Sequence, residues 1–118
     1  MSDTELAFMP TSELRARITS TQLSPVEVTR LYLQRIEALD TQLNSYLTVT
    51  GELALKMARD AEQAVLDNKP LGPLHGVPIS IKDLEVTNGI HTTLGCLIFE
   101  LTGVHRFHYY HVCIPNSE

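Results

Sequence analysis

The sequence has only two cysteines, Cys96 and Cys113, no long apolar run and no block of basic residues. Two cysteines without a close CxxC spacing indicate neither a disulfide framework nor a zinc finger, so we expect two reduced thiols. The nine basic residues are scattered, which argues against direct nucleic-acid binding. Because no run reaches membrane-spanning length and residues 1–5 are polar and acidic, unlike a secretory signal, we expect a cytoplasmic protein without membrane contact.

What the sequence does contain is the composition of a globular domain. Apolar residues make up 43% of the 118 positions and charged residues 19%, with a formal net charge of -5. These values lie far from the low hydrophobicity and high charge that are typical of disorder, and the length suits one domain. We therefore expect a single folded core.

The clearest helix start in the sequence is at Ser24. Ser24 is placed to cap a helix, Pro25 suits the first helical position, and Glu27 is placed to close a capping box. The pattern predicts a helix over residues 25–40. Its apolar stripe, at helical spacing, consists of Val28, Leu31, Tyr32, Ile36, Leu39 and Leu43.

Two further segments have apolar residues at helical spacing. Leu14 and Ile18 lie four positions apart and predict a short helix over residues 12–19. Small apolar residues on one face predict another helix over residues 52–67, and their size allows close approach to a neighbouring element.

Two short runs are typical of β-strands. Residues 46–50 are rich in β-branched side chains, and residues 77–83 alternate so that the apolar side chains share one face while Lys82 ends the other. Helices alternating with strands predict an α/β fold in which helices pack on an incomplete mixed β-sheet. An exposed edge of such a sheet would favour self-association.

Lys82 is the candidate catalytic residue. Among Ile79, Ile81 and Leu84 an ammonium would lose hydration, which favours the neutral amine, and a neutral amine can take a proton from a hydroxyl nucleophile. The same pattern suits a lysine that ends a strand and extends into water beside Asp83. The local pattern leaves both interpretations open.

A longer pattern surrounds Lys82. Residues 72–83, with the sequence GPLHGVPISIKD, are followed by Gly89, Thr92, Thr93 and Gly95. This stretch resembles the start of the amidase-signature family, which includes bacterial amidases, fatty-acid amide hydrolases and the A subunit of tRNA-dependent amidotransferases. Segments upstream are similar too, and the resemblance covers about residues 10 to 100: the upstream segments are LSPVEVT at 23–29, RIEAL at 35–39 and NSYLTVT at 44–50.

The resemblance implies the N-terminal part of the amidase-signature fold and an acyl-transfer reaction. In that family a lysine in this setting is the terminal base of a Ser-cisSer-Lys triad, and Lys82 matches it. A serine would attack the carbonyl of a small-molecule amide in the full-length parent, while backbone N–H groups stabilise the oxyanion. No metal or organic cofactor is implied. Within the family, the sequence of residues 77–84 slightly favours a stand-alone amidase as the full-length parent. The alternative parent is the A subunit of a tRNA-dependent amidotransferase.

The sequence departs from the family pattern after Lys82. Both family serines belong to a Gly/Ser-rich segment several tens of residues beyond the lysine, and these 118 residues contain no such segment. Cys96 stands where a serine is common, and Ser80, which shares a strand face with Lys82, matches neither family serine. We therefore expect a chain that is truncated before both serines and inactive alone. The alternative is a non-catalytic remnant or an interaction fragment.

Two parts are expected along the chain: residues 1–100 as the N-terminal portion of an amidase domain and residues 101–118 as a divergent tail. The tail holds three of the five histidines, and we attribute it to a frameshift, a premature stop or a misjudged gene boundary. Its histidines follow one another at steps of three, which aligns them only loosely along a helix and divides them between the two faces of a strand, so no dedicated metal site is expected. The potential ligands in the tail are His105, His108, His111 and Cys113. His75, in the turn before the second strand, could act as a ligand or base, but a structural hydrogen bond is the stronger expectation.

Overall fold

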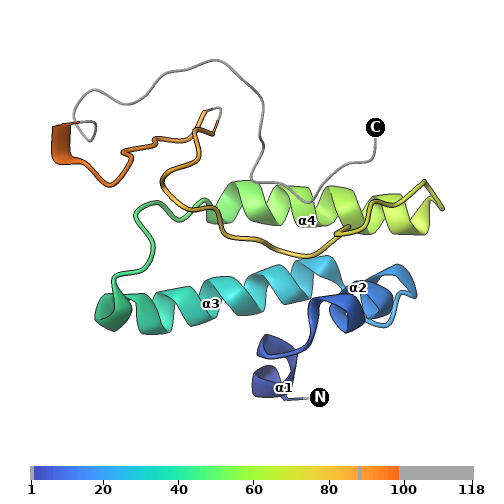
Figure 1. The fold of residues 1–118 in the computed structure, drawn as a ribbon. Coiled ribbons are helices and arrows are strands. Elements are labelled where there is room, and N and C mark those ends of the chain that lie inside the picture. Colours follow the sequence, from blue (N-terminus) through green and yellow to red (C-terminus); the bar gives the residue numbers. More distant parts are fainter. Residues whose placement is uncertain (1, 88, 99–118) are drawn as a thin grey trace. The chain divides into compact units, whose positions relative to one another are not determined.

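The computed structural model describes residues 2–87 and 89–98, and its elements of defined extent are four helices (Figure 1). Of the described residues, 2–78 form one compact unit, here called unit 1, and 79–98 belong to a second, unit 2. Unit 1 contains all four helices: α1 (Asp3–Ala7), α2 (Thr11–Thr19), α3 (Pro25–Leu43) and α4 (Gly51–Leu66). Unit 2 is built from turns and carries Lys82.

The expected mixed β-sheet is not present in the described residues, so the prediction of an α/β fold is wrong. Neither residues 46–50 nor residues 77–83 form a strand. A strand is stable only when its backbone N–H and C=O groups pair with those of a neighbouring strand, and neither run belongs to a strand pair within the described part of its own unit. Residues 46–50 instead connect α3 to α4, while Val77 turns its side chain into the helical core.

Helix α3 begins where the sequence predicted. The Ser24 hydroxyl accepts hydrogen bonds from the N–H groups of Val26 (3.1 Å) and Glu27 (3.3 Å), and Pro25 is the first helical residue. The helix ends at Leu43, slightly later than predicted, because Asn44 adopts the left-handed conformation (φ 53°) and donates its N–H to the carbonyl of Asp40.

The other two predicted helices are confirmed as α2 and α4, with ends that differ by about one residue. Helix α1 was not predicted, although its start carries a clear signal. The Ser2 hydroxyl accepts the N–H of Glu5 (3.2 Å), and the Glu5 carboxylate accepts the N–H of Ser2 (2.7 Å). The reciprocal capping box that the sequence suggested at α3 is thus formed at α1.

Helices α3 and α4 lie side by side and antiparallel (Figure 1). Ala58 and Ala61 of α4 are buried, and Val26 and Met57 pack against them. Alanine has only a methyl side chain, so the backbones of two helices can approach closely at such positions. The prediction that small residues on this helix would permit close packing is confirmed.

The core of unit 1 joins two helices to a loop. Leu14 and Ile18 of α2, Val28 of α3 and Val77 form one buried cluster. Partly buried apolar side chains surround it: Leu6, Met9, Leu23, Tyr32 and Val65. The loop at residues 72–78 is therefore a packed part of the core and not a surface connection.

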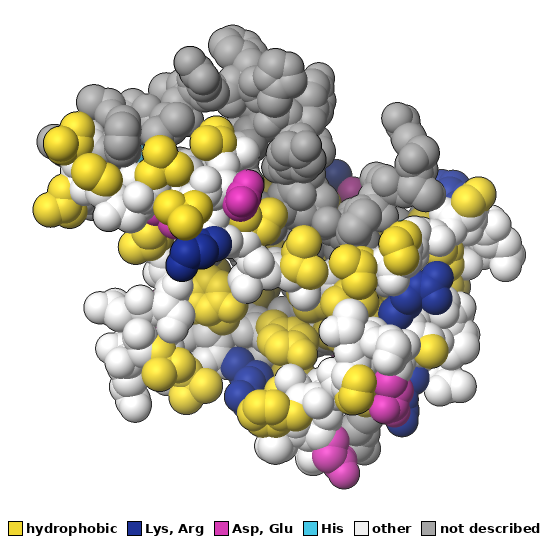
Figure 2. All heavy atoms as spheres, in the orientation of Figure 1, with side chains coloured by type: hydrophobic (Ala, Val, Ile, Leu, Met, Phe, Trp, Pro, Cys, Tyr) yellow, Lys and Arg dark blue, Asp and Glu magenta, His cyan; other side chains and the backbone are white. Residues whose placement is uncertain are grey.

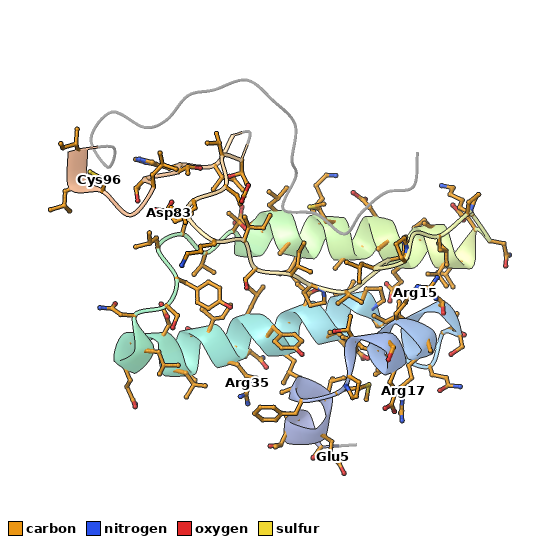
Figure 3. The ribbon with its side chains drawn as sticks, in the orientation of Figure 1. Glu5, Arg15, Arg17, Arg35, Asp83 and Cys96 are labelled. Carbon is orange, nitrogen blue, oxygen red and sulfur yellow. The ribbon has the colours of Figure 1, made fainter. Side chains whose placement is uncertain are left out.

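Polar contacts fix the same loop to two helices. The buried His75 ring places Nε2 2.9 Å from the carbonyl oxygen of Ala61, so this nitrogen carries the proton and donates. The Arg15 side chain, labelled in Figure 3, donates through Nε to the carbonyl of Gly72 (3.3 Å). The expectation of a structural hydrogen bond for His75 is confirmed.

Apolar side chains are exposed at the end of α3 and in the segment that connects it to α4. Leu43, Leu47 and Val49 are 65%, 70% and 51% exposed, and yellow side chains appear on the visible face of the helices in Figure 2. A hollow of about 400 Å³ lies beside them, lined by Leu33, Ile36, Glu37, Val49 and Gly51. Because the described residues form no sheet, self-association through a sheet edge has no basis in this part of the chain.

Gly76 sits where no side chain fits. Its φ is +79°, and a Cβ there would lie 2.7 Å from Cγ2 of the buried Ile18. We expect Gly76→Ala to lower the free energy of unfolding of unit 1 by about 2–4 kcal/mol, since it adds left-handed strain to overpacking. Urea denaturation followed by far-UV circular dichroism measures this. The matched control is Gly51→Ala, whose Cβ would make ordinary contacts at 3.6 Å with Leu33, and we expect it to change stability by less than about 1 kcal/mol. Equal effects of the two substitutions would contradict the packing of this loop.

Thr29 of α3 buries a hydroxyl that has no hydrogen-bond partner. Valine has the same shape without the polar group, so Thr29→Val should stabilise unit 1 by about 1–2 kcal/mol. Thr19→Val is the control, because the Thr19 hydroxyl donates to the carbonyl of Ala16 (3.1 Å) and nothing is gained by removing it. A loss of stability in Thr29→Val, measured by the same denaturation, would show that this hydroxyl is satisfied in solution.

Candidate functional site

Lys82 lies at the start of a turn in unit 2. Its carbonyl accepts the N–H of Glu85 (3.0 Å), and its side chain is exposed. The neighbouring Ile79 and Leu84 are 42% and 58% exposed, so unit 2 by itself does not enclose the amine in the apolar surroundings that the sequence suggested. Ser80 is exposed as well, and no hydrogen bond joins it to Lys82 within the described part of the chain. The role of Lys82 as a base stays a prediction.

The residue after Lys82 makes the main polar contacts of unit 2. Asp83 accepts the N–H of Thr93 through Oδ1 (2.8 Å) and the N–H of Gly95 through Oδ2 (2.8 Å). The Thr93 hydroxyl donates to Oδ2 as well. We call this arrangement the Asp83 clasp; Figure 3 labels Asp83 and Cys96 in this unit. One carboxylate thus holds a turn that lies ten residues further along the chain.

The turn held by the clasp has an unusual backbone. The Cys96 N–H donates to the carbonyl of Thr93 (3.0 Å), and the two central residues, Leu94 and Gly95, have φ of 53° and 67°. Positive φ at both central positions defines a type I′ turn. Glycine adopts this conformation readily, whereas a residue such as leucine is strained there by about 1–2 kcal/mol. The hydrogen bonds to Asp83 offset that strain.

The clasp also sets the charge state of Asp83. The hydroxyl of Thr93, followed by the N–H groups of Thr93 and Gly95, stabilises the carboxylate and holds the pKa of Asp83 below its usual value. The positive charge of a protonated His91 acts in the same direction. Asp83 is therefore ionised at neutral pH and remains so in mild acid.

The clasp was missed by sequence reasoning, which treated Asp83 only as a polar neighbour of Lys82. Thr93 and Gly95 had been singled out as part of a family-like pattern, but their spacing does not reveal a shared partner. Cys96 carries a free, half-buried thiol at the end of the clasped turn.

Metal ligands do not gather in the part of the chain that the structure describes. Residues 2–87 and 89–98 contain no group of three or more His, Cys, Asp or Glu side chains placed to hold an ion. The histidines and the cysteine that were considered as ligands in the tail, residues 105–113, lie outside the described residues. Nor is any helix of the described ranges long and apolar enough to span a membrane.

Comparison with known families identifies the class of protein. The model of the Amidase family matches residues 27–102, a segment that contains both Lys82 and the clasp. The chain therefore belongs to the amidase family, as its motifs indicated.

The relatives it matches are considerably longer. The chain is 44% identical over 96 residues to the A subunit of the glutamyl-tRNA(Gln) amidotransferase from Geobacter sp. (strain M21), covering 81% of this chain and 20% of the relative. It is 41% identical over 96 residues to the protein of the same name from Carboxydothermus hydrogenoformans, with the same two coverages, and 41% identical over 100 residues to that from Streptomyces coelicolor, covering 85% and 20%. The chain thus spans about a fifth of the length of these relatives. No solved structure matches it significantly.

The lowered pKa of Asp83 makes the clasp sensitive to acid in a defined direction. The folded-state pKa lies below the unfolded value of about 3.9, so the contribution of the clasp is complete above that pH and is lost as the pH falls through the folded pKa. We expect the amide proton shifts of Thr93 and Gly95, followed by NMR, to titrate with a midpoint below about pH 3.9. Asp83→Asn should abolish the transition. A midpoint at or above the ordinary aspartate value would contradict the hydrogen bonds described here.

Proposed function

We propose that this chain supplies the lysine base of an amide-cleaving site, with Lys82 as the terminal base of a Ser-cisSer-Lys triad whose serines come from a segment outside these 118 residues. The observation that carries the proposal is the Amidase family match over residues 27–102, which includes Lys82 within the sequence GVPISIKD. The length of the relatives, about five times the matched segment, leaves room for such a serine-bearing segment.

The proposed chemistry is acyl transfer. The serine oxygen bonds to the amide carbon, its proton passes through the bridging serine to the neutral amine of Lys82, and the carbonyl oxygen becomes an oxyanion. When the oxyanion collapses, the carbon–nitrogen bond breaks and the leaving nitrogen takes a proton back along the same path. A second nucleophile, water or an acceptor amine, then releases the acyl group.

The 118 residues alone are not expected to cleave amides. Several of their serines already have structural partners: Ser2 and Ser24 cap α1 and α3, and the Ser20 hydroxyl donates to the carbonyl of Arg17 (3.2 Å). Ser80 is exposed and lies outside any glycine-rich turn. Without a nucleophile, only residual positioning remains.

The relatives favour one branch of the family. All three are named as the A subunit of a glutamyl-tRNA(Gln) amidotransferase, whereas residues 77–84 had leaned toward stand-alone amidases. We propose that the parent belongs to such an amidotransferase, with an amide as nitrogen donor and further subunits as partners. A non-catalytic remnant or interaction fragment is the second candidate.

Within the chain we propose residues 1–100 as the family portion and residues 101–118 as a divergent tail. The end of the family match at residue 102 supports this division.

A graft tests the proposed role of Lys82. Residues 2–98 of this chain would replace the matching segment of the Geobacter relative, and release of ammonia from a panel of simple amides would be measured. We expect turnover, and we expect Lys82→Ala to lower it by about 10²–10⁴-fold, the usual contribution of a general base. Lys69→Ala is the matched control, since Lys69 is an exposed lysine paired with Asp67 (3.1 Å), and its turnover should be unchanged. A grafted enzyme that keeps its rate after Lys82→Ala would rule out this role.

A further inference from the structure

We propose that Asp83 is a positioning residue for Lys82, and that it acts by clasping the Thr93–Cys96 turn. The inference rests on the proposed function, because it assigns a supporting residue to the base proposed there. It goes beyond that function because it assigns a role to the contact between Asp83 and Thr93, which lie ten residues apart in sequence. This contact holds the segment that carries Lys82.

The position of Asp83 couples two turns. Lys82 opens the first turn, closed by the hydrogen bond from the Glu85 N–H to the Lys82 carbonyl (3.0 Å), and Asp83 is its second residue. The carboxylate of Asp83 holds the second turn through Thr93 and Gly95. Asp83 directly follows Lys82, and its carboxylate is hydrogen-bonded to Thr93 and Gly95 of the same unit. These bonds therefore fix the backbone on the C-terminal side of Lys82.

The clasp stabilises a strained backbone conformation in the second turn. Leu94 has a positive φ, which leucine rarely adopts, and such a conformation persists only where the surroundings over-determine it. Here the surroundings are the Asp83 carboxylate, which accepts three hydrogen bonds from Thr93 and Gly95 and so holds Leu94 in this conformation. Backbone strain held in this way is typical of functional sites.

The carboxylate of Asp83 is bonded to Thr93 and Gly95 and forms no ion pair with the neighbouring amine in the described part of the chain. Among the described residues, no ion pair joins Asp83 to Lys82, although the two are adjacent in sequence. A bonded carboxylate beside the ammonium would stabilise the charged form and oppose its use as a base. The hydrogen bonds of Asp83 to Thr93 and Gly95 therefore fix the backbone next to Lys82 without a direct ion pair to its amine.

Thr93→Val tests the clasp without changing any charge. It removes the hydroxyl donor to Asp83 and leaves the backbone intact, so in the 118-residue chain we expect amide hydrogen exchange at Gly95 and Glu85 to quicken about tenfold, the effect of losing one charge-assisted hydrogen bond. Thr93→Ser keeps the hydroxyl and should restore slow exchange. The control is Thr48→Val, at an exposed threonine of unit 1. Unchanged exchange at Gly95 in Thr93→Val would overturn the clasp.

The grafted enzyme tests the positioning role itself. With Lys82 intact, Thr93→Val should lower kcat about tenfold per folded molecule with KM unchanged, and Thr93→Ser should recover it. A merely structural role would lower the folded fraction and leave kcat per folded molecule the same.

The two proposals fail in different ways. If Lys82→Ala abolishes turnover and Thr93→Val keeps the full kcat, the positioning role is wrong while the role of Lys82 stands. If Lys82→Ala keeps turnover, the proposed function is wrong, and the positioning role falls with it.

Discussion

The packing of Val77 against Ile18 and Val28 is the contact on which the architecture of unit 1 depends. It places a loop that lacks regular structure inside a core otherwise made by helices. The same loop is bonded to α2 through Arg15 and to α4 through His75, so one short segment contacts all three longer helices. Burial of apolar area draws the elements together, and the two polar contacts satisfy groups that would otherwise be buried unpaired.

The helices were predictable because their signals are local. Ser24 and Pro25 fix the start of α3 through bonds within one turn of the chain, and the spacing of Leu14 and Ile18 identifies α2. The sheet was predicted wrongly because a β-rich run states only that its side chains would suit a strand, whereas a strand also requires a partner that sequence alone does not reveal. Helix α1 was missed although Ser2 and Glu5 have the spacing of a capping box.

The family was predictable from the sequence, whereas the environment of the candidate residue Lys82 was not. Lys82 stood out through a motif, and that motif led to the correct family. Its apolar surroundings did not follow, because alternation along a strand has no meaning where no strand forms. The contacts of Asp83 depend on Leu94 and Gly95 turning the chain back with positive φ, and a leucine gives no sequence signal for that conformation.

The residues of the family motif divide by what they touch. In the first half, His75 bonds to Ala61, Gly76 leaves space for Ile18, and Val77 fills the core, so each is explained by packing within unit 1. The second half begins near Lys82, the residue proposed above as the base, and the side-chain contacts of Asp83 there lie within unit 2. The family match covers both halves of the motif alike. The packing of unit 1 is therefore a reason to retain the first half that does not depend on catalysis. The match of this chain to the Amidase family therefore includes residues whose described contacts stabilise unit 1.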